Sequence, residues 1–259
     1  MIRVVRLSIA PVKSTALHHP EEVRLESYGA VGNRRFYVAE PDGRLFDGTD
    51  FGPLVTIRAD FDATRDRLSL RFPDGSVVDG DVQAVGEPVR TDMYGREVTG
   101  RVLEGPWAGA LTNHVGRPLV LVRSDEAGAA VGEFAVSISG TASAAELAER
   151  SGRPEALDSR RFRMLVEVDG TGPHEEDSWI GRTARIGEAL VRVEMPVARC
   201  VITTQDPSTG LKDLDTLKAI AEYRGLRDGR SIDFGVYGSV AEPGLIRVSD
   251  PVEVDPAAG

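Results

Sequence analysis

The only cysteine of the chain, Cys200, is the first residue whose type and surroundings could support chemistry. A free cysteine is commonly a small buried hydrophobic residue, and the neighbours of this one are largely apolar. Two features favour a functional thiol instead. Arg199 could stabilise a thiolate, although adjacent residues on a strand should point to opposite faces. The polar stretch at 203–210 is typical of a loop, where functional groups gather. The residues alone leave both alternatives open, a buried filler or a functional thiol.

The common catalytic and metal-binding motifs are missing from the sequence. It contains no GxSxG nucleophile elbow, no P-loop and no HExxH helix. Among the histidines, only His18 and His19 are close together, and neighbours on a strand point apart, which makes them poor joint ligands. The histidines are therefore expected to have structural or surface roles.

The composition is that of a globular protein with an excess of acidic residues. The 259 residues carry a formal net charge of -10, with 41% hydrophobic and 28% charged residues. Nucleic acid needs a basic face, so this charge argues against a nucleic-acid partner, while a local basic pocket could still hold a small anion. One cysteine forms no internal disulfide, and no stretch approaches the about 20 apolar residues of a membrane span. We expect a cytoplasmic protein with no membrane contact.

Hydrophobic patterning predicts strands through most of the chain, with a few short helices. The first half alternates apolar and polar residues between turns, and two Pro-Asp-Gly triplets indicate hairpins within 34–46 and 55–78. Helices are expected at 106–116, 141–150 and 213–225. Later strands are expected at 161–170, 183–197 and 200–207. For the second helix, Thr141 or Ser143 could supply the N-cap, and Glu146 stands where a capping box with Ser143 requires it.

These elements predict a mainly β fold of the α+β type, with two domains. Short strands at this spacing are typical of a barrel or a curled sheet. A polar loop near 125–132 marks a boundary. We therefore expect an N-terminal β-barrel-like domain at 1–125, followed by a β-rich barrel with a few short helices at 126–259.

Several segments, taken in order, resemble the MOSC domain, named after the C-terminal domain of molybdenum cofactor sulfurase. The C-terminal ones read "DSRRFRMLVEV", "HEEDSWIG", "RCVITTQDPSTG", "LDTLKAIAEYR", "FGVYGSV" and "GLIRVSDPVEV". The earlier "APVKS", "GAVGNRRFYVAEPDG" and "PLVTI" are similar to the β-barrel domain that precedes MOSC domains. The two-part arrangement is similar to that of the mitochondrial amidoxime-reducing component and its bacterial relatives, which reduce N-hydroxylated compounds with a molybdenum cofactor.

The resemblance implies a function and a set of site residues. It makes the protein a molybdenum-dependent reductase of small N-hydroxylated molecules, with Mo-molybdopterin as the cofactor. Cys200 would be the catalytic thiolate and the protein's own ligand to molybdenum, and a soft sulfur suits that metal. The residues implied to contact the cofactor are Lys13, Ser14, Arg34, Arg163, Arg199 and Cys200. Cationic side chains suit the phosphate of the pterin. Asp177 and Trp179 are expected to hold the fold.

The chain departs from the family pattern at two positions near the implied site. Asn33 replaces the usual aspartate before Arg34, which removes a charge that could orient the guanidinium. Leu165 stands where the family has a cofactor-contacting asparagine, so a polar contact is lost if that side chain faces the site. We expect cofactor binding with altered geometry.

A reductase of this kind needs a separate electron donor. The chain has no flavin or haem motif, and its single cysteine excludes an iron–sulfur cluster held by four thiolates. Electrons would therefore come from another protein, such as a flavin or iron–sulfur reductase.

Two other functions remain as alternatives to the reductase. The protein could be a sulfur carrier or transferase with a persulfide on Cys200. It could also be a non-catalytic carrier of the molybdenum cofactor.

Overall fold

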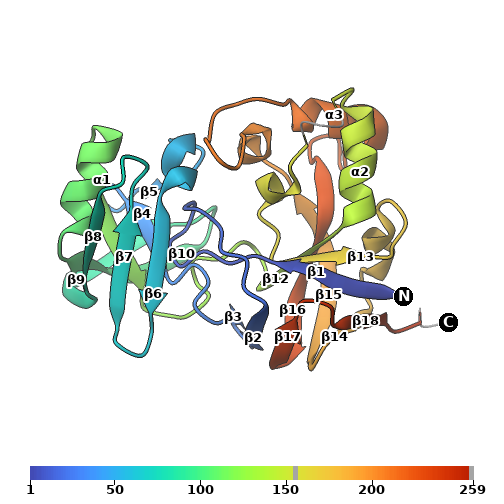
Figure 1. The fold of residues 1–259 in the computed structure, drawn as a ribbon, viewed down its shortest axis with the longest axis horizontal. Helices are drawn as coiled ribbons and strands as arrows, with labels where there is room; N and C mark the ends of the chain where they lie inside the picture. The colour runs from blue at the N-terminus through green and yellow to red at the C-terminus, as the bar shows by residue number, and fades with distance from the viewer. Residues whose placement is uncertain (154–156, 257–259) are drawn as a thin grey trace.

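The chain folds into two lobes, and a small sheet packs against one of them. The computed structural model describes residues 1–153 and 157–256. Figure 1 shows a barrel lobe on the right and a second β-rich lobe on the left. A small three-stranded sheet packs against the barrel lobe and has the order β17 (Gly244–Arg247), β2 (Glu22–Glu26) and β3 (Gly29–Ala30). It pairs an early segment of the chain with a late one, and its buried side chains belong to the core cluster of the barrel.

The barrel lobe is a closed barrel of seven strands. In order around the barrel they are β1 (Ile2–Leu7), β13 (Val166–Asp169), β12 (Val136–Gly140), β16 (Asp233–Glu242), β15 (Ala189–Ala198), β14 (Thr183–Ile186) and β18 (Pro251–Val254). Its interior is filled largely by β-branched and aliphatic side chains, such as Val4, Val168 and Val236, none of which is exposed. The strands β12 and β13 are parallel, so the chain needs a crossover between them, and helix α2 (Thr141–Arg150) provides it.

The second lobe packs two sheets and a helix around the larger of its two buried clusters. The five-stranded sheet has the order β5 (Leu45–Phe46), β4 (Phe36–Ala39), β11 (Val120–Ser124), β10 (Glu97–Glu104) and β9 (Gln83–Asp92). The three-stranded sheet has the order β6 (Arg58–Asp62), β7 (Arg67–Arg71) and β8 (Val77–Asp81). Helix α1 (Trp107–Val115) places Trp107 in this core, where its indole N–H donates to the Leu68 carbonyl at 3.2 Å.

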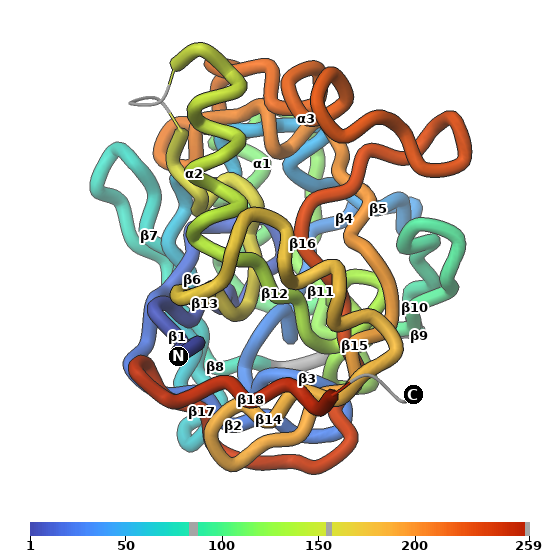
Figure 2. Tube along the Cα trace, turned by 90° about the vertical axis from the view of Figure 1, so that its right-hand side faces the viewer, coloured from blue at the N-terminus to red at the C-terminus, as the bar shows by residue number. Residues whose placement is uncertain are grey.

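Most of the expected elements are present, and the expected fold class is confirmed. The three helices α1, α2 and α3 (Thr216–Arg224) lie within the expected ranges. Figure 2 shows α2 and α3 together at one end of the molecule, with β2 and β17 at the opposite end. In the described part of the chain, no helix has the length and hydropathy needed to cross a bilayer. The domain boundary at residues 125 and 126 stays a prediction, although strand pairing crosses it, since β1 belongs to the barrel.

Two expectations about local structure are wrong. Residues 200–207 do not form a strand; residues Val201–Thr204 form the 3-10 helix η5 instead. The Thr203 hydroxyl donates to the Cys200 carbonyl at 3.0 Å and the Thr204 hydroxyl donates to the Val201 carbonyl at 2.7 Å. These bonds three residues back favour a tight turn over the extended form that β-branched residues usually prefer. Similarly, Ser159–Phe162 form the 3-10 helix η3, and the strand expected at 161–170 shortens to β13.

The expected capping box at the start of α2 is also absent. Gly140 is the N-cap residue, and it has no side chain to accept a bond. The Ser143 hydroxyl lies inside the helix, donates to the buried Glu176 carboxylate at 2.8 Å and accepts from the His174 backbone N–H at 2.8 Å. The hydroxyl therefore serves a buried carboxylate rather than the helix end.

Candidate active site between the two lobes

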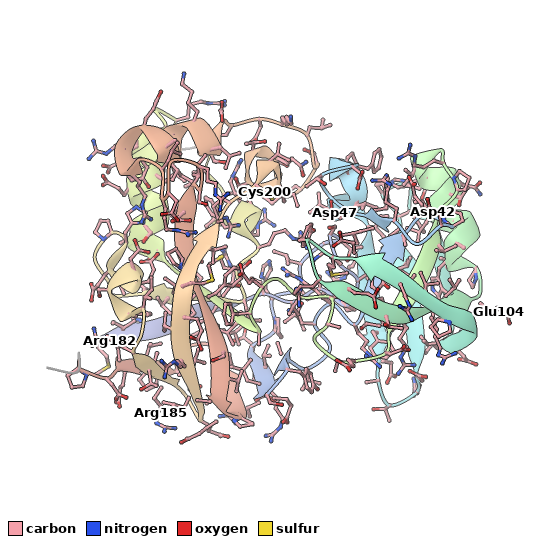
Figure 3. The ribbon with its side chains drawn as sticks, turned by 180° about the vertical axis from the view of Figure 1, so that it is seen from behind. Asp42, Asp47, Glu104, Arg182, Arg185 and Cys200 are labelled. Carbon is pink, nitrogen blue, oxygen red and sulfur yellow. The ribbon has the colours of Figure 1, made fainter. Side chains whose placement is uncertain are left out.

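A cavity of about 460 Å³ lies between the two lobes. Its walls come from the segment after β1, the tip of the β9–β10 hairpin, η3 and the turn after β15. All six residues expected to contact a cofactor line it: Lys13, Ser14, Arg34, Arg163, Arg199 and Cys200. Figure 3 shows Cys200 on the barrel lobe and Asp47 on the lobe opposite it. Residues from distant parts of the sequence thus share one space, while their roles stay predictions.

Cys200 is exposed, so the buried-filler alternative is wrong. Strand β15 ends at Ala198, and Cys200 is the extended N-cap residue of η5, with its carbonyl accepting from the Thr203 N–H at 3.1 Å. Because neither Arg199 nor Cys200 lies within a strand, the alternation that should point them apart does not apply. Both side chains line the same cavity.

Arg199 is held beside the cysteine by the barrel lobe. Its guanidinium donates to the Phe162 carbonyl at 2.5 Å and to the Met164 sulfur at 3.4 Å, and it lies over the Phe162 ring. Its Nε atom is buried and has no hydrogen-bond partner in the described part of the protein. Burial lowers the pKa of Arg199, and the nearby Tyr237 and Cys200 oppose that effect. A polar atom left unpaired in this way is suited to an acceptor supplied by a ligand.

Lys13 presents an ammonium group with little solvation. The side chain is 7% exposed, and its Nζ donates to the Ala130 carbonyl at 3.2 Å and sits 5.0 Å from the centroid of the Tyr94 ring. Burial, followed by repulsion from Arg34, lowers the pKa of Lys13 from 10.5 to about 7, although Asp47 acts in the opposite direction. An anion bound in the cavity would restore the charge.

Ser14 follows Lys13 in a left-handed backbone conformation, with φ of 69°. Its hydroxyl oxygen accepts a bond from the Gly48 N–H at 3.1 Å, and the residue lines the cavity. The strained backbone is the kind of local feature that surrounding structure sustains at functional sites. Ser14 thereby links the N-terminal segment to the loop after β5.

Arg34 and Arg163 also have left-handed backbones, with φ of 49° and 53°. The Arg163 guanidinium donates to the Thr15 carbonyl at 2.7 Å. The Arg34 side chain makes no hydrogen bond or ion pair with residues 1–153 or 157–256. Burial is the largest influence on both guanidinium groups and lowers the pKa of each, and Arg34 adds repulsion to Arg163. Arg34 is therefore the cation of the cavity whose side chain is left for a ligand to bind.

The two departures from the family pattern have structural explanations. The Asn33 amide oxygen accepts from the Ala10 N–H at 3.0 Å, and the Arg34 N–H donates to the Ala10 carbonyl at 2.6 Å. Asn33 therefore fixes the backbone that carries Arg34, without a charge. Leu165 is 3% exposed, packs in the core of the barrel and is not part of the lining of the main cavity, whereas its role toward a cofactor stays a prediction.

Sequence reasoning missed several residues that complete the site. Tyr94 and Arg96 reach the cavity from the β9–β10 hairpin tip, and Tyr237 reaches it from β16. Asp47, 2% exposed, accepts a hydrogen bond from the Tyr94 hydroxyl and another from the Thr49 N–H at 2.8 Å. Among these residues, only Tyr94 stands beside a local sequence pattern, the glycine of the Tyr94-Gly95 turn. The other contacts join residues that are far apart in the sequence, so no local pattern predicts them.

The donor set fits an anionic ligand that carries a soft metal centre. Several cations face one cavity, one of them is unpartnered and another has an orphaned Nε atom. Lys13 is buried and the three arginines expected to contact a cofactor are partly buried, and cations withdrawn from water gain from an anionic partner. Among the described residues, no three His, Cys, Asp or Glu side chains are grouped to hold a metal ion by themselves. A metal bound beside Cys200 would therefore bring further ligands with it, as a dithiolene pterin does.

The chain is similar to several known proteins. The chain is 36% identical over 104 residues to mitochondrial amidoxime-reducing component 1 of Mus musculus and 38% identical over 107 residues to mitochondrial amidoxime reducing component 2 of Homo sapiens. Each of these matches covers 37% of this chain and only 30% of the relative. Component 1 of Danio rerio is 26% identical over 287 residues, covering 96% of this chain and 83% of the relative. The solved YUAD protein of Bacillus subtilis superposes with a TM-score of 0.48 at 15% identity, covering 98% of this chain and 96% of that one.

Two domain families account for almost the whole chain. Residues 1–118 match the MOSC N-terminal beta barrel domain, and residues 108–253, more than half of the chain, match the MOSC domain. The protein therefore belongs to the MOSC family, with the N-terminal barrel domain ahead of the MOSC domain.

Proposed function

We propose that this protein binds the molybdenum cofactor between its two lobes and reduces N-hydroxylated small molecules. One observation carries the proposal: an exposed single cysteine shares a cavity with Lys13, Arg34, Arg163 and Arg199, and these cations lack a full set of protein partners in the described structure. The similarity to amidoxime-reducing components suggests the substrate class.

Each residue has a role that follows from its chemistry. Arg34, Lys13 and Arg163 would hold the phosphate, since charge-assisted bonds to an anion are the strong kind. Arg199 would donate from its free Nε to the pterin, and Ser14 would add its hydroxyl hydrogen. Cys200 would bind the metal through its thiolate, and the bound group would then supply two-electron redox chemistry.

The overall reaction balances with protons from the solvent and electrons from a partner. The N–O bond breaks, the substrate gains two electrons and two protons, and the oxygen leaves as water. We assign the electrons to a separate donor protein with a flavin or an iron–sulfur cluster, and we place the activity in the cytoplasm.

The sulfur-carrier alternative is less well supported. An exposed thiol could also carry a persulfide. Persulfide transfer, however, does not require four cations around a cavity of this size. A non-catalytic cofactor carrier would use the same cations, so occupancy alone does not separate it from a reductase.

Two measurements on protein from a host that makes the cofactor test the proposal. Elemental analysis with pterin detection should find molybdenum at about one per chain, and the loaded protein should reduce an N-hydroxylated compound with an artificial reductant. Absence of molybdenum would exclude the reductase and leave the sulfur carrier. Full occupancy without turnover would leave the cofactor carrier.

A further inference from the structure

An exposed tyrosine lines the cavity without any assigned role. Tyr94 is 62% exposed, the highest fraction among the large aromatic side chains of the described residues, yet it lies in the lining of the cavity. The other aromatic rings of the lining are occupied: Phe162 stacks on Phe234 with 4.0 Å between centroids, and Tyr237 packs near Phe134. Tyr94 is therefore the aromatic surface that remains open to a ligand.

The backbone at Tyr94 is one that tyrosine seldom adopts. Met93 and Arg96 exchange backbone hydrogen bonds of 2.7 and 3.4 Å, which closes a two-residue turn at Tyr94-Gly95. The φ angles of the two turn residues are 58° and 84°, so both are left-handed. Asn or Gly is the preferred first residue of such a turn. A bulky residue here is an outlier that local structure does not require, which points to a function of the side chain.

The ring is nevertheless held in one place. Its hydroxyl donates to the buried Asp47 carboxylate, and the Lys13 ammonium lies against one side of the ring at 5.0 Å from the centroid. Arg96, in the same turn, donates to the Val131 and Gly132 carbonyls at 3.0 and 2.9 Å. An exposed ring fixed at both the hydroxyl and the backbone is preorganised for stacking rather than free to move.

We propose that Tyr94 is a specificity-determining residue that stacks against the planar conjugated group bearing the substrate N–OH. Rings favour offset or edge contacts with other π systems, and such pairs add to the burial of apolar surface. An aryl amidoxime offers a ring next to a planar N–OH group, whereas an alkyl amidoxime offers only the small planar group. Tyr94 should therefore favour aryl substrates. This inference rests on the proposed function.

The test compares benzamidoxime with acetamidoxime in four proteins. Tyr94→Asn removes the ring and suits the left-handed turn, while Tyr94→Phe keeps the ring and loses only the bond to Asp47. Tyr28→Asn is the matched control, since Tyr28 is an exposed turn tyrosine outside the cavity lining. The readouts are KM and kcat of the cofactor-loaded proteins with a reduced viologen dye as the electron donor. The Kd of benzamidoxime is measured separately by titration calorimetry without reductant.

For Tyr94→Asn we expect KM and Kd for benzamidoxime to rise about tenfold, with kcat and the KM for acetamidoxime within about twofold. The Phe variant keeps the ring but loses the anchor to Asp47, so its KM and Kd for benzamidoxime should rise less than those of Tyr94→Asn, and the Tyr28→Asn control should stay near wild type. Equal weakening of both substrates would overturn the proposal, because it would mean that Tyr94 only shields Lys13. No weakening would overturn it as well. If wild type reduces neither compound, the proposed function fails, while the calorimetric comparison still decides the role of Tyr94.

Discussion

Gly52 and Gly210 meet backbone to backbone across the space between the two lobes. A β-carbon on either residue would overlap the carbonyl oxygen of the other. Beside this contact, the Gln205 side-chain amide donates to the Gly48 carbonyl at 2.9 Å, and the Ile202 side chain lies against Gly48. Figure 1 shows the orange loop after η5 reaching toward the blue helix η1 (Gly52–Thr56). The segment that follows Cys200 therefore rests on the N-terminal lobe.

Gly52→Ala should change the reactivity of Cys200. The added methyl group must push the loop away, and overpacking of this kind destabilises a protein by about 1–3 kcal/mol. The rate at which a disulfide reagent labels the thiol should shift several-fold, and the chain has no other cysteine to confuse the signal. Gly109→Ala in α1 is the control, since a β-carbon there meets nothing within 4 Å. An unchanged labelling rate in Gly52→Ala would show that the contact does not position the thiol.

Cys200→Ala should abolish reduction while the fold persists. Because the side chain is exposed, its removal should change the free energy of unfolding by less than about 0.5 kcal/mol. Molybdenum content should fall, since the only cysteine of the chain is gone. Assays of turnover, metal content and melting on one preparation check all three outcomes. A variant that reduces N-hydroxylated compounds at the wild-type rate would refute the assignment of the metal ligand.

Lys13 should make anion binding depend on pH. The pKa of the free protein's Lys13 is lowered to about 7, so above that pH the ammonium loses its proton unless an anion holds it. Sulfate keeps the same charge from pH 6 to 9, which makes it a clean probe. Its affinity for protein without cofactor should fall at least about fivefold between pH 6 and pH 8.5, with proton uptake on binding. Calorimetry in two buffers measures both effects.

The lowered pKa of Lys13 also determines the direction in which the stability of the protein changes with pH. The pKa of Lys13 is lower in the folded protein than in the unfolded chain, so the unfolded chain binds more protons between about pH 7 and 10.5. The contribution of Lys13 to stability therefore rises with pH through that window and is unfavourable below it. Lys13→Met should flatten both the stability profile and the sulfate profile. If the variant keeps the wild-type pH dependence of sulfate binding, another group is responsible.

Arg34→Ala should weaken anion binding without weakening the fold. The guanidinium has no protein partner within the described residues and repels Lys13 and Arg163, so its loss leaves no carboxylate unpaired. Cofactor retention in dialysis should drop at least about tenfold for a lost charge-assisted contact. The melting temperature without cofactor should stay the same or rise.

Arg192→Ala is the matched control for Arg34→Ala, because Arg192 is an exposed arginine on β15 beside Glu194. It should retain the cofactor as wild type does. Full retention in Arg34→Ala would mean that the anion binds elsewhere.

The sequence predicted which residues share the cavity better than it predicted the local structure around them. Ordered motifs identified Lys13, Arg34 and Cys200, and the fold brings them to one cavity. The β-branched run after Cys200 was misread because two threonine hydroxyls bond back to the chain and close a 3-10 turn. Contacts such as Tyr94 with Asp47 depend on long-range packing, which no local pattern encodes.

Leu165→Asn tests whether the family motif or the packing of the barrel describes this position correctly. The motif has an amide here, whereas the structure places Leu165 in the barrel core at 3% exposure. An unsatisfied buried amide should lower stability by about 1–3 kcal/mol, or roughly 2–4 °C in melting temperature per kcal/mol. Leu165 also borders a cavity of about 20 Å³ that has room for one water, which would partner the amide and move the loss toward the lower value.

Leu165→Met keeps the volume and should cost less than the asparagine variant, so it separates polarity from packing. Molybdenum retention in dialysis should be the same in Leu165→Asn and wild type, because the side chain does not line the main cavity. An asparagine variant with an unchanged melting temperature and better retention would place this residue at the cofactor after all. Lower melting with unchanged retention would confirm that the barrel, and not the site, determines which residue stands here.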